Sequence, residues 1–411
     1  MNKKTIIFKI ADFPLTSETF IVAQITCALN LGYDVKILVN KFITSNLGLY
    51  KDVFETHNLI DKIVEENYKI PKNKFIRLIQ WFVLLVSNIN SLTSIISFLK
   101  TQKGFSLSSL FQWVFYQEFN DKKNIFHVQY GTNKNPLDLL KSTGFYKPSL
   151  IVTFHGHDAF FPINGFIPNN GYYNNLFTYA NLITANTPYL ADQLLKINCP
   201  DEKLSIVPVG VDTTFFKPIE DRVFEKEKLK LITVGRLDPV KGHRYGIDIV
   251  KKLIKKGVPV EFTIVGEGEE LKKLEEQIEI LGLQNQVFLL GKKNQNEIRE
   301  LFWNHDLYLL TAVALPDGRR ETQGLATLEA QSCGLPVIAF DSGGVKYTIH
   351  EGVTGFVCEE YNVDEVVSRI EKLYNDTNRL KDMSLNTQKF INETYSLTFV
   401  ESKWEVLYKN K

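Results

Sequence analysis

The sequence alternates short, continuously apolar segments with amphipathic stretches of helical length along most of its 411 residues. Runs such as Ile151–Phe154 (IVTF) and Leu307–Leu310 (LYLL) lack apolar–polar alternation, which indicates strands buried on both faces. Strands of this kind, separated by helices, form parallel sheets that helices cover on both sides. The sequence therefore predicts α/β domains of the doubly wound, Rossmann-like type.

The predicted strands fall into two groups, one in each half of the chain. In the first half they are Thr5–Ile10, Asp34–Val39, Asn124–Val128, Leu150–Phe154, Asn181–Thr184 and Leu204–Val207. In the second half they are Lys228–Val234, Val260–Val265, Val287–Leu290, Asp306–Leu310 and Leu335–Ala339. The charged start of the chain mimics a signal peptide, but Lys9 and Asp12 interrupt its apolar run, so we interpret it as a first core strand.

The boundary between the halves lies near 213–229, where a proline and a run of charged residues precede a new strand. We therefore expect one Rossmann-like domain over 1–215 and a second over 228–385. Two such domains leave a cleft between the carboxyl ends of their strands, where ligands bind in folds of this kind.

Charge and cysteine content exclude several classes of protein. The chain has 48 basic and 47 acidic residues, which disfavours nucleic-acid binding through bulk charge. Up to residue 215 there are 20 basic and 16 acidic residues, and after it 28 and 31, so a mildly basic, membrane-facing first domain remains open. The four cysteines have neither metal-ligand spacing nor a disulfide pattern, and they suit a reducing cytosol.

The segment 75–100 is the most apolar part of the chain, and three interpretations of it stay open. Its charge-free run, 78–99, is long enough to span a membrane, but Gln80, Asn88 and several hydroxyl residues interrupt it. A buried or partner-facing helix pair is the second interpretation. The third is a helix on a membrane surface, with contact through 69–103. It is favoured by the cations that come just before the segment: Lys69, Lys72, Lys74 and Arg77.

A candidate phosphate site opens the second half. Gly235 directly follows a predicted strand, and Arg236 and Lys241 precede an amphipathic helix that begins near His243. Two cations at the carboxyl end of a strand, beside a helix N-terminus, suit a bound phosphate. The alternative is a pair of exposed surface cations.

A glycine pair, Gly266 and Gly268, follows the next predicted strand on either side of Glu267. The third glycine of a dinucleotide fingerprint is missing because residue 271 is leucine, so NAD binding is not supported. The pair fits a tight turn that lets a nucleotide approach the backbone.

Two glutamates eight residues apart lie in the densest motif of the chain. Glu321 follows a buried strand in a polar loop, and Gly324 opens a helix that holds Glu329. The amides of Leu325 and Ala326 at the start of this helix would be free donors for an anion. Glu329 could accept hydrogen bonds from a ribose diol, and Glu321 could meet sugar hydroxyls. The alternative is a capping acid plus a solvated glutamate.

Polar residues also follow a buried strand in the first half, at His155, Gly156, His157 and Asp158. Their place at the carboxyl end of a strand suits a ligand site in which His155 is catalytic or orients a substrate. A packed structural histidine is one alternative. A zinc site is another, although no distant third ligand is evident.

Two further loops follow strands of the first half. One places Ser17, Glu18 and Thr19 before a helix, where Ser17 suits an N-cap and ligand contact is the alternative. The other holds His127 and Gly131.

Two common phosphate motifs are absent from the sequence. There is no DxD pair, with which Mg²⁺ or Mn²⁺ commonly bridges a diphosphate, so we expect no metal and no other cofactor. A bound diphosphate would then be met by Arg236, Lys241 and helix dipoles. The P-loop pattern GxxxxGK[ST] is also absent, which excludes a P-loop ATPase.

Taken together, these motifs resemble a known family. GRLDPVKG, VGEGEE and ETQGLATLEAQSCGLPVIAFDSGG, with FHGHD upstream, are similar to the retaining glycosyltransferases of family 4, which have the GT-B fold. The resemblance covers most of the chain and is strongest over 231–358. FPLTSETFI, HVQYGT and FHGHD further resemble the branch that builds bacterial surface polysaccharides such as colanic acid.

The resemblance implies a role for each candidate residue. Arg236 and Lys241 would hold the diphosphate of a UDP- or GDP-sugar. Glu329 would bind the ribose and Glu321 the donor-sugar hydroxyls, while His155 would touch the donor sugar near its reacting carbon. The other implied donor contacts are Gly235, Gly266, Glu267, Gly324, Leu325 and Ala326. The implied acceptor contacts are Ser17, Glu18, Thr19, His127 and Asp158.

The implied activity is metal-independent, retaining transfer of the sugar to a lipid-linked oligosaccharide in surface polysaccharide biosynthesis, at the cytoplasmic face of the membrane. No protein nucleophile is expected, because the donor phosphate would take the acceptor proton. The domain over 1–215 would bind the acceptor, that over 228–385 the donor, and a last helix over 386–411 would pack back on the first domain. Gln323 stands where the family commonly has a small residue. A non-catalytic sugar-nucleotide-binding protein and a GT-B epimerase are the alternatives.

Overall fold

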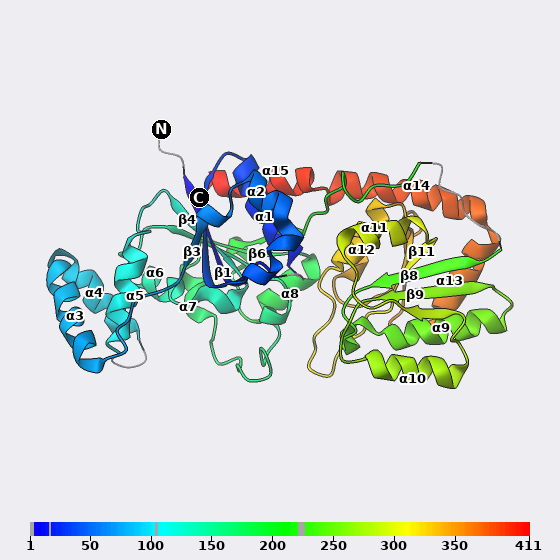
Figure 1. The fold of residues 1–411 in the computed structure, drawn as a ribbon, viewed down its shortest axis with the longest axis horizontal. Coiled ribbons are helices and arrows are strands. Elements are labelled where there is room, and N and C mark those ends of the chain that lie inside the picture. Colours follow the sequence, from blue (N-terminus) through cyan, green and yellow to red (C-terminus); the bar gives the residue numbers. More distant parts are fainter. Residues whose placement is uncertain (1–3, 16–17, 103–105, 221–226) are drawn as a thin grey trace. The chain divides into compact units, whose positions relative to one another are not determined.

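The computed structural model describes residues 4–15, 18–102, 106–220 and 227–411, which form two compact units (Figure 1). Unit 1 comprises Met1–Ala185, Ala191–Ile206 and Glu401–Lys411. Unit 2 comprises Asn186–Leu190 and Val207–Val400. The chain therefore returns to unit 1 at Glu401, whereas the sequence placed this return at residue 386.

Unit 1 is built on a seven-stranded parallel sheet with the order β3-β2-β1-β4-β5-β6-β7. Its strands are β1 (Thr5–Phe13), β2 (Asp34–Phe42), β3 (Ile63–Glu65), β4 (Asn124–Gln129), β5 (Ser149–Thr153), β6 (Leu182–Ala185) and β7 (Leu204–Ile206). The helices of this part of the chain are α1 (Thr19–Asn30), α2 (Lys51–Thr56), α3 (Lys74–Ser87), α4 (Leu92–Thr101), α5 (Ser108–Gln117), α6 (Leu137–Ser142), α7 (Asn174–Tyr179) and α8 (Pro188–Lys196).

Unit 2 is built on a six-stranded parallel sheet with the order β10-β9-β8-β11-β12-β13. Its strands are β8 (Leu229–Val234), β9 (Val260–Val265), β10 (Val287–Leu289), β11 (Leu307–Leu310), β12 (Val337–Phe340) and β13 (Gly355–Cys358). The helices that follow β8 along the chain are α9 (His243–Lys255), α10 (Leu271–Leu281), α11 (Gln295–Trp303), α12 (Leu325–Ser332), α13 (Val363–Asn375), α14 (Thr377–Thr394) and α15 (Leu397–Lys409). Both units are thus Rossmann-like, and the predicted fold class is confirmed.

Every predicted strand is present, and two further strands were missed. The missed strands, β3 and β13, each form one edge of a sheet. They have only three and four residues, and charged residues flank the first while the second begins at a glycine. The edge strands β7 and β10 are equally short, so length alone does not hide a strand. In β3 and β13 only two and three consecutive residues are apolar, which gives no strand pattern to read.

The continuously apolar strands are explained by packing on both faces of each sheet. Successive residues of β8 enter different clusters of buried side chains. Leu231 packs in the cluster that holds Ile247 of α9 and Ile370 of α13. Ile232, on the opposite face, packs in the cluster that holds Leu328 of α12. The alternation of faces along a strand therefore places apolar side chains on both sides of the sheet.

The end of α15 is fixed to unit 1 by the buried His127 of β4. His127 Nδ1 lies 2.7 Å from the Tyr408 hydroxyl, and Nε2 lies 2.7 Å from Thr153 Oγ1. The imidazole also packs on Trp404, with ring centroids 4.8 Å apart. Burial, with a contribution from nearby His155, lowers the pKa of His127 to about 3, so the ring is neutral. The family resemblance implied an acceptor contact for His127, but the structure buries it completely and pairs both its ring nitrogens.

Replacing Tyr408 with phenylalanine should therefore destabilise unit 1. Tyr408→Phe keeps the ring but leaves a buried imidazole nitrogen without its partner, which costs about 1–3 kcal/mol. Urea unfolding measures the loss. Tyr179→Phe, at an exposed tyrosine of the same unit, is the matched control and should change stability by less than about 0.5 kcal/mol. Equal stability of the two variants would contradict the assigned role of His127.

Candidate active site

The loop after β8 holds Lys241 in a fixed place through its neighbours. The Asp238 carboxylate accepts a hydrogen bond from the Val240 amide at 3.0 Å and caps the short helix Pro239–Lys241. Gly242 has a φ of 61°, and a Cβ there would lie 2.0 Å from the Thr311 carbonyl oxygen. Thr311 Oγ1 in turn donates to the Gly242 carbonyl at 2.8 Å. Only glycine allows this close approach, which anchors the loop to the end of β11.

Arg236, in the same loop, is held through its backbone and leaves its guanidinium in solvent. His243 Nε2 lies 3.1 Å from the Arg236 carbonyl oxygen. Burial lowers the pKa of His243 to about 4, so the neutral ring donates this hydrogen bond. The Arg236 side chain is 73% exposed, and its nearest carboxylate, that of Asp238, lies 3.9 Å away. The guanidinium is therefore accessible to an anionic ligand.

Gly266 and Gly268 brace this loop from the end of β9. A Cβ on Gly266 would lie 1.9 Å from the Gly235 carbonyl oxygen, and one on Gly268 would lie 2.4 Å from that of Leu237. The Leu237 amide also donates to the Glu267 carbonyl at 2.9 Å. From the sequence, these glycines were expected to let a nucleotide approach the backbone. In the structure, the close approach of the loop after β9 to the loop after β8 already leaves no room for a Cβ at either position.

Glu321 joins the two loops of unit 2 that the sequence singled out. Its Oε2 forms an ion pair with Lys241, and both side chains are largely buried. Its Oε1 accepts hydrogen bonds from the amides of Thr322 at 3.1 Å and Gly324 at 3.1 Å, with Gln323 at 3.4 Å. Burial alone would raise the pKa of Glu321, but the Lys241 charge and these hydrogen bonds lower it, so the group is ionised. Glu321 is thus a capping acid and an ion-pair partner at once.

The loop after β12 supports Glu321 from behind, a role that the sequence analysis missed. A Cβ on Gly343 would lie 2.2 Å from the Glu321 carbonyl oxygen, and one on Gly344 would lie 1.8 Å from that of Thr322. The Gly344 amide donates to the Glu321 carbonyl at 2.8 Å. The Asp-Ser-Gly-Gly sequence directly after a buried strand was the available signal.

Gln323 points away from the start of α12. Its side-chain amide is buried and pairs twice with the backbone of Val209, at 3.0 Å each way. This departure from the family pattern therefore fixes the position of the loop within unit 2.

The first turn of α12 offers donors and a carboxylate to a ligand. The amides of Leu325 and Ala326 follow the three amides that donate to Glu321, and they have no acceptor within the ranges that the structure covers. Glu329 lies one turn further on, and no ion pair or hydrogen bond joins its carboxylate to another described residue. Burial raises the pKa of Glu329 to about 7. A half-buried carboxylate without donors is unfavourable for the fold, and a ligand with hydroxyl donors would relieve this cost.

Glu329→Gln should make the protein more stable at high pH. The pKa of Glu329 is about 7 in the folded protein and near 4.5 in the unfolded chain, so folding favours the protonated form. Stability therefore falls as pH rises from about 4.5 to 7, and the cost is fully present above pH 7.

Glutamine cannot ionise, so the variant should exceed the wild type by about 1–3 kcal/mol at pH 8 and match it near pH 4. Denaturant unfolding at both pH values measures this difference. Glu276→Gln, at an exposed site on α10, is the control and should show no such gain. A Glu329→Gln gain that did not depend on pH would contradict the titration of Glu329.

In unit 1, side chains from the ends of β4 and β5 and from α1 gather around His155. His155 Nε2 lies 2.8 Å from Gln129 Oε1 at the end of β4, and Gln129 Nε2 donates to Gln24 Oε1 of α1 at 2.8 Å. The His155 ring packs between Phe20, at 4.7 Å, and Tyr130, at 4.6 Å between ring centroids. Burial, followed by the effect of His157, lowers the pKa of His155 to about 3. The ring is neutral and donates its Nε2 proton to Gln129.

Asp158 organises the backbone next to His155. Its carboxylate accepts hydrogen bonds from the amides of His155 at 3.1 Å, Gly156 at 2.9 Å and Gly131 at 2.8 Å. The side chain is fully buried. The family resemblance implied an acceptor contact for Asp158, whereas in the structure its oxygens accept hydrogen bonds from the protein's own backbone.

The loop before α1 contributes Glu18 to the same edge of the sheet. Glu18 Oε1 accepts a hydrogen bond from the Tyr130 hydroxyl at 2.8 Å, and burial raises the pKa of Glu18. Glu18 occupies the N-cap position of α1, and Thr19 begins the helix. Ser17 lies outside the described residues. Three neighbours of this group were not predicted from the sequence: Gln129 and Tyr130, at the carboxyl end of β4, and Phe20, in the first turn of α1.

Metal-ligating side chains do not gather in the part of the chain that the structure describes: no group of three or more His, Cys, Asp or Glu residues there could hold an ion. His155, His157 and Asp158 therefore do not form the zinc site that the sequence left as an alternative. The Asp158 carboxylate faces backbone amides instead.

Two family models match consecutive parts of the chain. Residues 98–215 match glycosyltransferase family 4, and residues 216–390 match glycosyl transferases group 1. The chain is a glycosyltransferase with one domain of each family. The two matches together cover the described parts of 98–390, and they include His155 as well as the Lys241–Glu321 pair.

Curated relatives of this glycosyltransferase match it over most of its length. The amylovoran biosynthesis glycosyltransferase AmsK of Erwinia amylovora is 26% identical over 368 residues, which is 88% of each chain. The putative colanic acid biosynthesis glycosyltransferase WcaL of Escherichia coli is 26% identical over 370 residues, 88% of this chain and 89% of the relative.

Solved structures share the fold of the glycosyltransferase at low sequence identity. The Anabaena protein HepE, crystallised with UDP, has a TM-score of 0.72 at 17% identity, over 99% of this chain and all of the other. TarM from S. aureus has a TM-score of 0.69 at 15% identity, over 98% and 99% of the two chains. Both likenesses support the GT-B fold.

Proposed function

We propose that this glycosyltransferase transfers a sugar from a UDP- or GDP-sugar to a lipid-linked oligosaccharide, with retention of configuration and without a metal ion. The observation that carries the proposal is the arrangement around Glu321. It places Lys241, the unpaired amides of Leu325 and Ala326 and the unpaired carboxylate of Glu329 about one short helix of unit 2.

Each part of this arrangement suits one part of a nucleotide sugar. The exposed Arg236 guanidinium and the Lys241 ammonium supply positive charge for a diphosphate, and the start of α12 adds amide donors. The Glu329 carboxylate would accept hydrogen bonds from the two hydroxyls of a ribose. The pair that Glu321 forms with Lys241 leaves the loop ordered before the donor arrives, so little reorganisation is needed on binding.

The reaction that we propose requires no protein nucleophile. The acceptor hydroxyl would attack the anomeric carbon from the face that the diphosphate leaves, and the bond between that carbon and the phosphate oxygen would break. The departing phosphate oxygen takes the proton of the acceptor hydroxyl, so atoms and charge balance. Arg236 and Lys241 would stabilise the negative charge that develops on the leaving group. The neutral His155 would contact the donor sugar as a hydrogen-bonding group.

The names of the relatives support a place in surface polysaccharide biosynthesis. AmsK is named for amylovoran and WcaL for colanic acid, and the HepE crystals contain UDP. The nucleotide-sugar-binding region would be the one over 228–385, and the acceptor-binding region the one over 1–215. Acceptor contacts would come from Glu18 and Thr19, which lie at the carboxyl edge of the unit 1 sheet.

Transfer should be abolished in Lys241→Ala and in Glu329→Ala while both proteins stay folded. Lys241→Ala removes the charge that meets the diphosphate, and the backbone donors on Glu321 remain, so the loop keeps its cap. The assay is release of UDP or GDP that depends on a glycan acceptor, measured with EDTA present. Lys252→Ala, which breaks an exposed ion pair with Asp364 on the same unit, is the matched control and should be active.

Normal turnover by either folded variant would contradict the assigned donor site. Loss of activity in EDTA that Mg²⁺ or Mn²⁺ restores would contradict the metal-independent reaction. Nucleotide release without any acceptor, together with a changed sugar, would favour the epimerase. Binding of a nucleotide sugar without turnover would favour a non-catalytic binding protein.

A further inference from the structure

Helices α3 and α4 form an arm of unit 1 that leaves large apolar side chains in solvent. No single helix in the described ranges is long and apolar enough to cross a membrane, and the α3–α4 pair passes that test only with a bend of 78° between its helices. No side chain of α3, which lies wholly within a described range, is buried. The arm is therefore neither a straight membrane span nor a fully buried helix pair.

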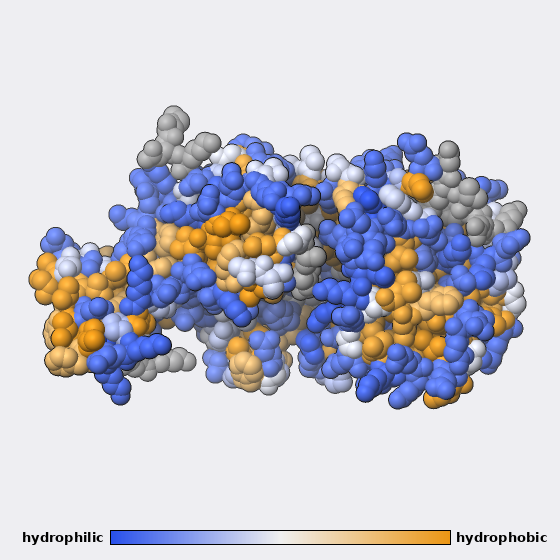
Figure 2. All heavy atoms as spheres, in the orientation of Figure 1, coloured by the Kyte–Doolittle hydropathy of each residue, from blue (hydrophilic) through white to orange (hydrophobic). Residues whose placement is uncertain are grey.

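The exposed apolar side chains of α3 form one continuous face. They recur at helical spacing along the outer side of the helix: Phe75, Ile76, Leu78, Ile79, Phe82, Val83 and Val86. Phe75 is 71% exposed and Val86 is 67% exposed. The face continues past the bend through Ile89, Leu92 and Ile96. Figure 2 shows the orange side chains gathered over this arm. A surface helix of a soluble protein normally turns its polar side outwards, so this contiguous patch indicates a binding surface.

The arm is attached firmly at its base, so its exposed face does not result from loose packing. Ile95 and Phe98 of α4 are fully buried, and the Trp113 indole of α5 donates to Ser94 Oγ at 3.2 Å. α3 packs beside α5 on its inner side.

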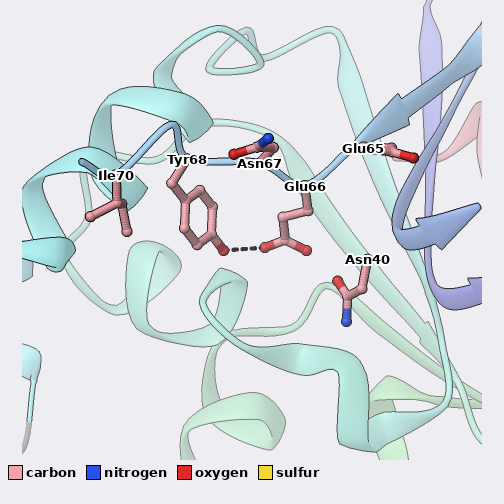
Figure 3. A pocket seen from close by; sticks show the side chains of 6 residues that line it. All are labelled: Asn40, Glu65, Glu66, Asn67, Tyr68 and Ile70. Atoms are coloured by element: carbon pink, nitrogen blue, oxygen red, sulfur yellow. Dashed lines mark hydrogen bonds between the residues drawn. The ribbon is translucent and has the colours of Figure 1, made fainter. Parts of the chain in front are cut away.

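The segment that leads into α3 is tied to the edge of the sheet by a buried polar cluster. Glu66, which follows β3, forms an ion pair with Lys9 of β1 and accepts hydrogen bonds from Tyr68 and, at 2.6 Å, from Tyr116. Gln112 of α5 donates to the Tyr68 hydroxyl at 3.1 Å. Figure 3 shows Tyr68 pointing at Glu66 in the wall of a polar pocket of about 390 Å³ at the ends of β2 and β3. The cluster fixes where the arm leaves the domain.

The charge of the arm selects one kind of partner. Between Asn67 and Gln102 the sequence has no acidic residue, and it has five cations: Lys69, Lys72, Lys74, Arg77 and Lys100. Lys69, Lys72 and Lys74 are exposed just before the apolar face begins. Two copies of the arm packed face to face would bring like charges together, which disfavours a dimer through this surface. Cations beside an exposed apolar helix face match a layer of anionic lipid headgroups above acyl chains.

We propose that α3 and the start of α4 dock on the surface of an anionic lipid bilayer, with the apolar face in the headgroup–acyl boundary and the lysines on the headgroups. Docking would hold unit 1 at the layer where a lipid-linked acceptor resides, so the biological purpose of the contact rests on the proposed function. The contact itself needs neither nucleotide sugar nor acceptor.

The test is sedimentation of the full chain with vesicles of phosphatidylcholine containing 30% phosphatidylglycerol, at low salt and without nucleotide. The wild type should sediment with these vesicles, and binding should weaken at least tenfold at 0.5 M NaCl or with phosphatidylcholine alone. Ile79→Glu/Phe82→Glu should weaken binding at least tenfold.

Controls separate this docking from general stickiness, misfolding and catalysis. Ile280→Glu/Leu385→Glu changes two apolar residues on α10 and α14 that are more exposed than Ile79 and Phe82, and this variant should bind vesicles like the wild type. Glu329→Gln should also bind vesicles normally. Vesicle binding therefore tests the docking separately from the proposed transfer reaction. Circular dichroism and thermal melting establish that each variant is folded.

Three results would overturn the proposal. The wild type could stay in the supernatant with anionic vesicles at low salt. Ile79→Glu/Phe82→Glu could bind as well as Ile280→Glu/Leu385→Glu. Sedimentation velocity could show a wild-type dimer that the α3 substitutions convert to monomer, which would assign the face to a second copy of the chain.

Discussion

The carboxylate of Glu321 forms the interactions on which the candidate site of unit 2 depends. One oxygen pairs with Lys241 from the loop after β8, and the other accepts hydrogen bonds from the amides of Thr322 and Gly324, just before α12. A buried carboxylate is stable only when charge and hydrogen bonds compensate its lost hydration, and here they come from the two loops that would have to act together. The glycines of the neighbouring loops, Gly242 and Gly344, let the backbones approach closely enough for this pairing. Glu329, one turn along α12, lacks such compensation, and the contrast between the two glutamates separates a structural carboxylate from one free to bind a ligand.

Much of the fold could be predicted from the sequence because buried parallel strands are continuously apolar. The strands that were missed, β3 and β13, contain only two and three consecutive apolar residues, too few to show this pattern. The candidate donor residues could also be predicted, because glycines, cations and glutamates directly after strands are visible in one dimension. Their local roles could not. Gly266 and Gly268 are required by the close approach of an adjacent backbone loop, and Gln323 binds the Val209 backbone. No sequence pattern predicts either contact.

Unit 1 shows the same limit for histidines and acids. The sequence treated His127, His155 and Asp158 alike, as polar residues at strand ends. In the structure His127 is buried and bonded to α15, and Asp158 caps the turn that carries His155. His155 contacts Tyr130 and Gln129 at the edge of the sheet. The apolar segment before α5 was equally ambiguous, because its composition suits a core helix, a membrane span or a surface helix. The direction in which its side chains point, outwards along α3, is a property of the folded chain.

The central claim is that the ends of β8 and β11 and the start of α12 in unit 2 hold the nucleotide sugar. Amide hydrogen–deuterium exchange of the intact protein, with and without UDP- and GDP-sugars in EDTA, tests it most directly, because it reports on the open amides of Leu325 and Ala326. The account predicts slower exchange in the peptides that contain 235–242 and 324–329 when one class of nucleotide sugar is added. Protection confined to other parts of the chain, at a nucleotide concentration that supports turnover, would contradict it.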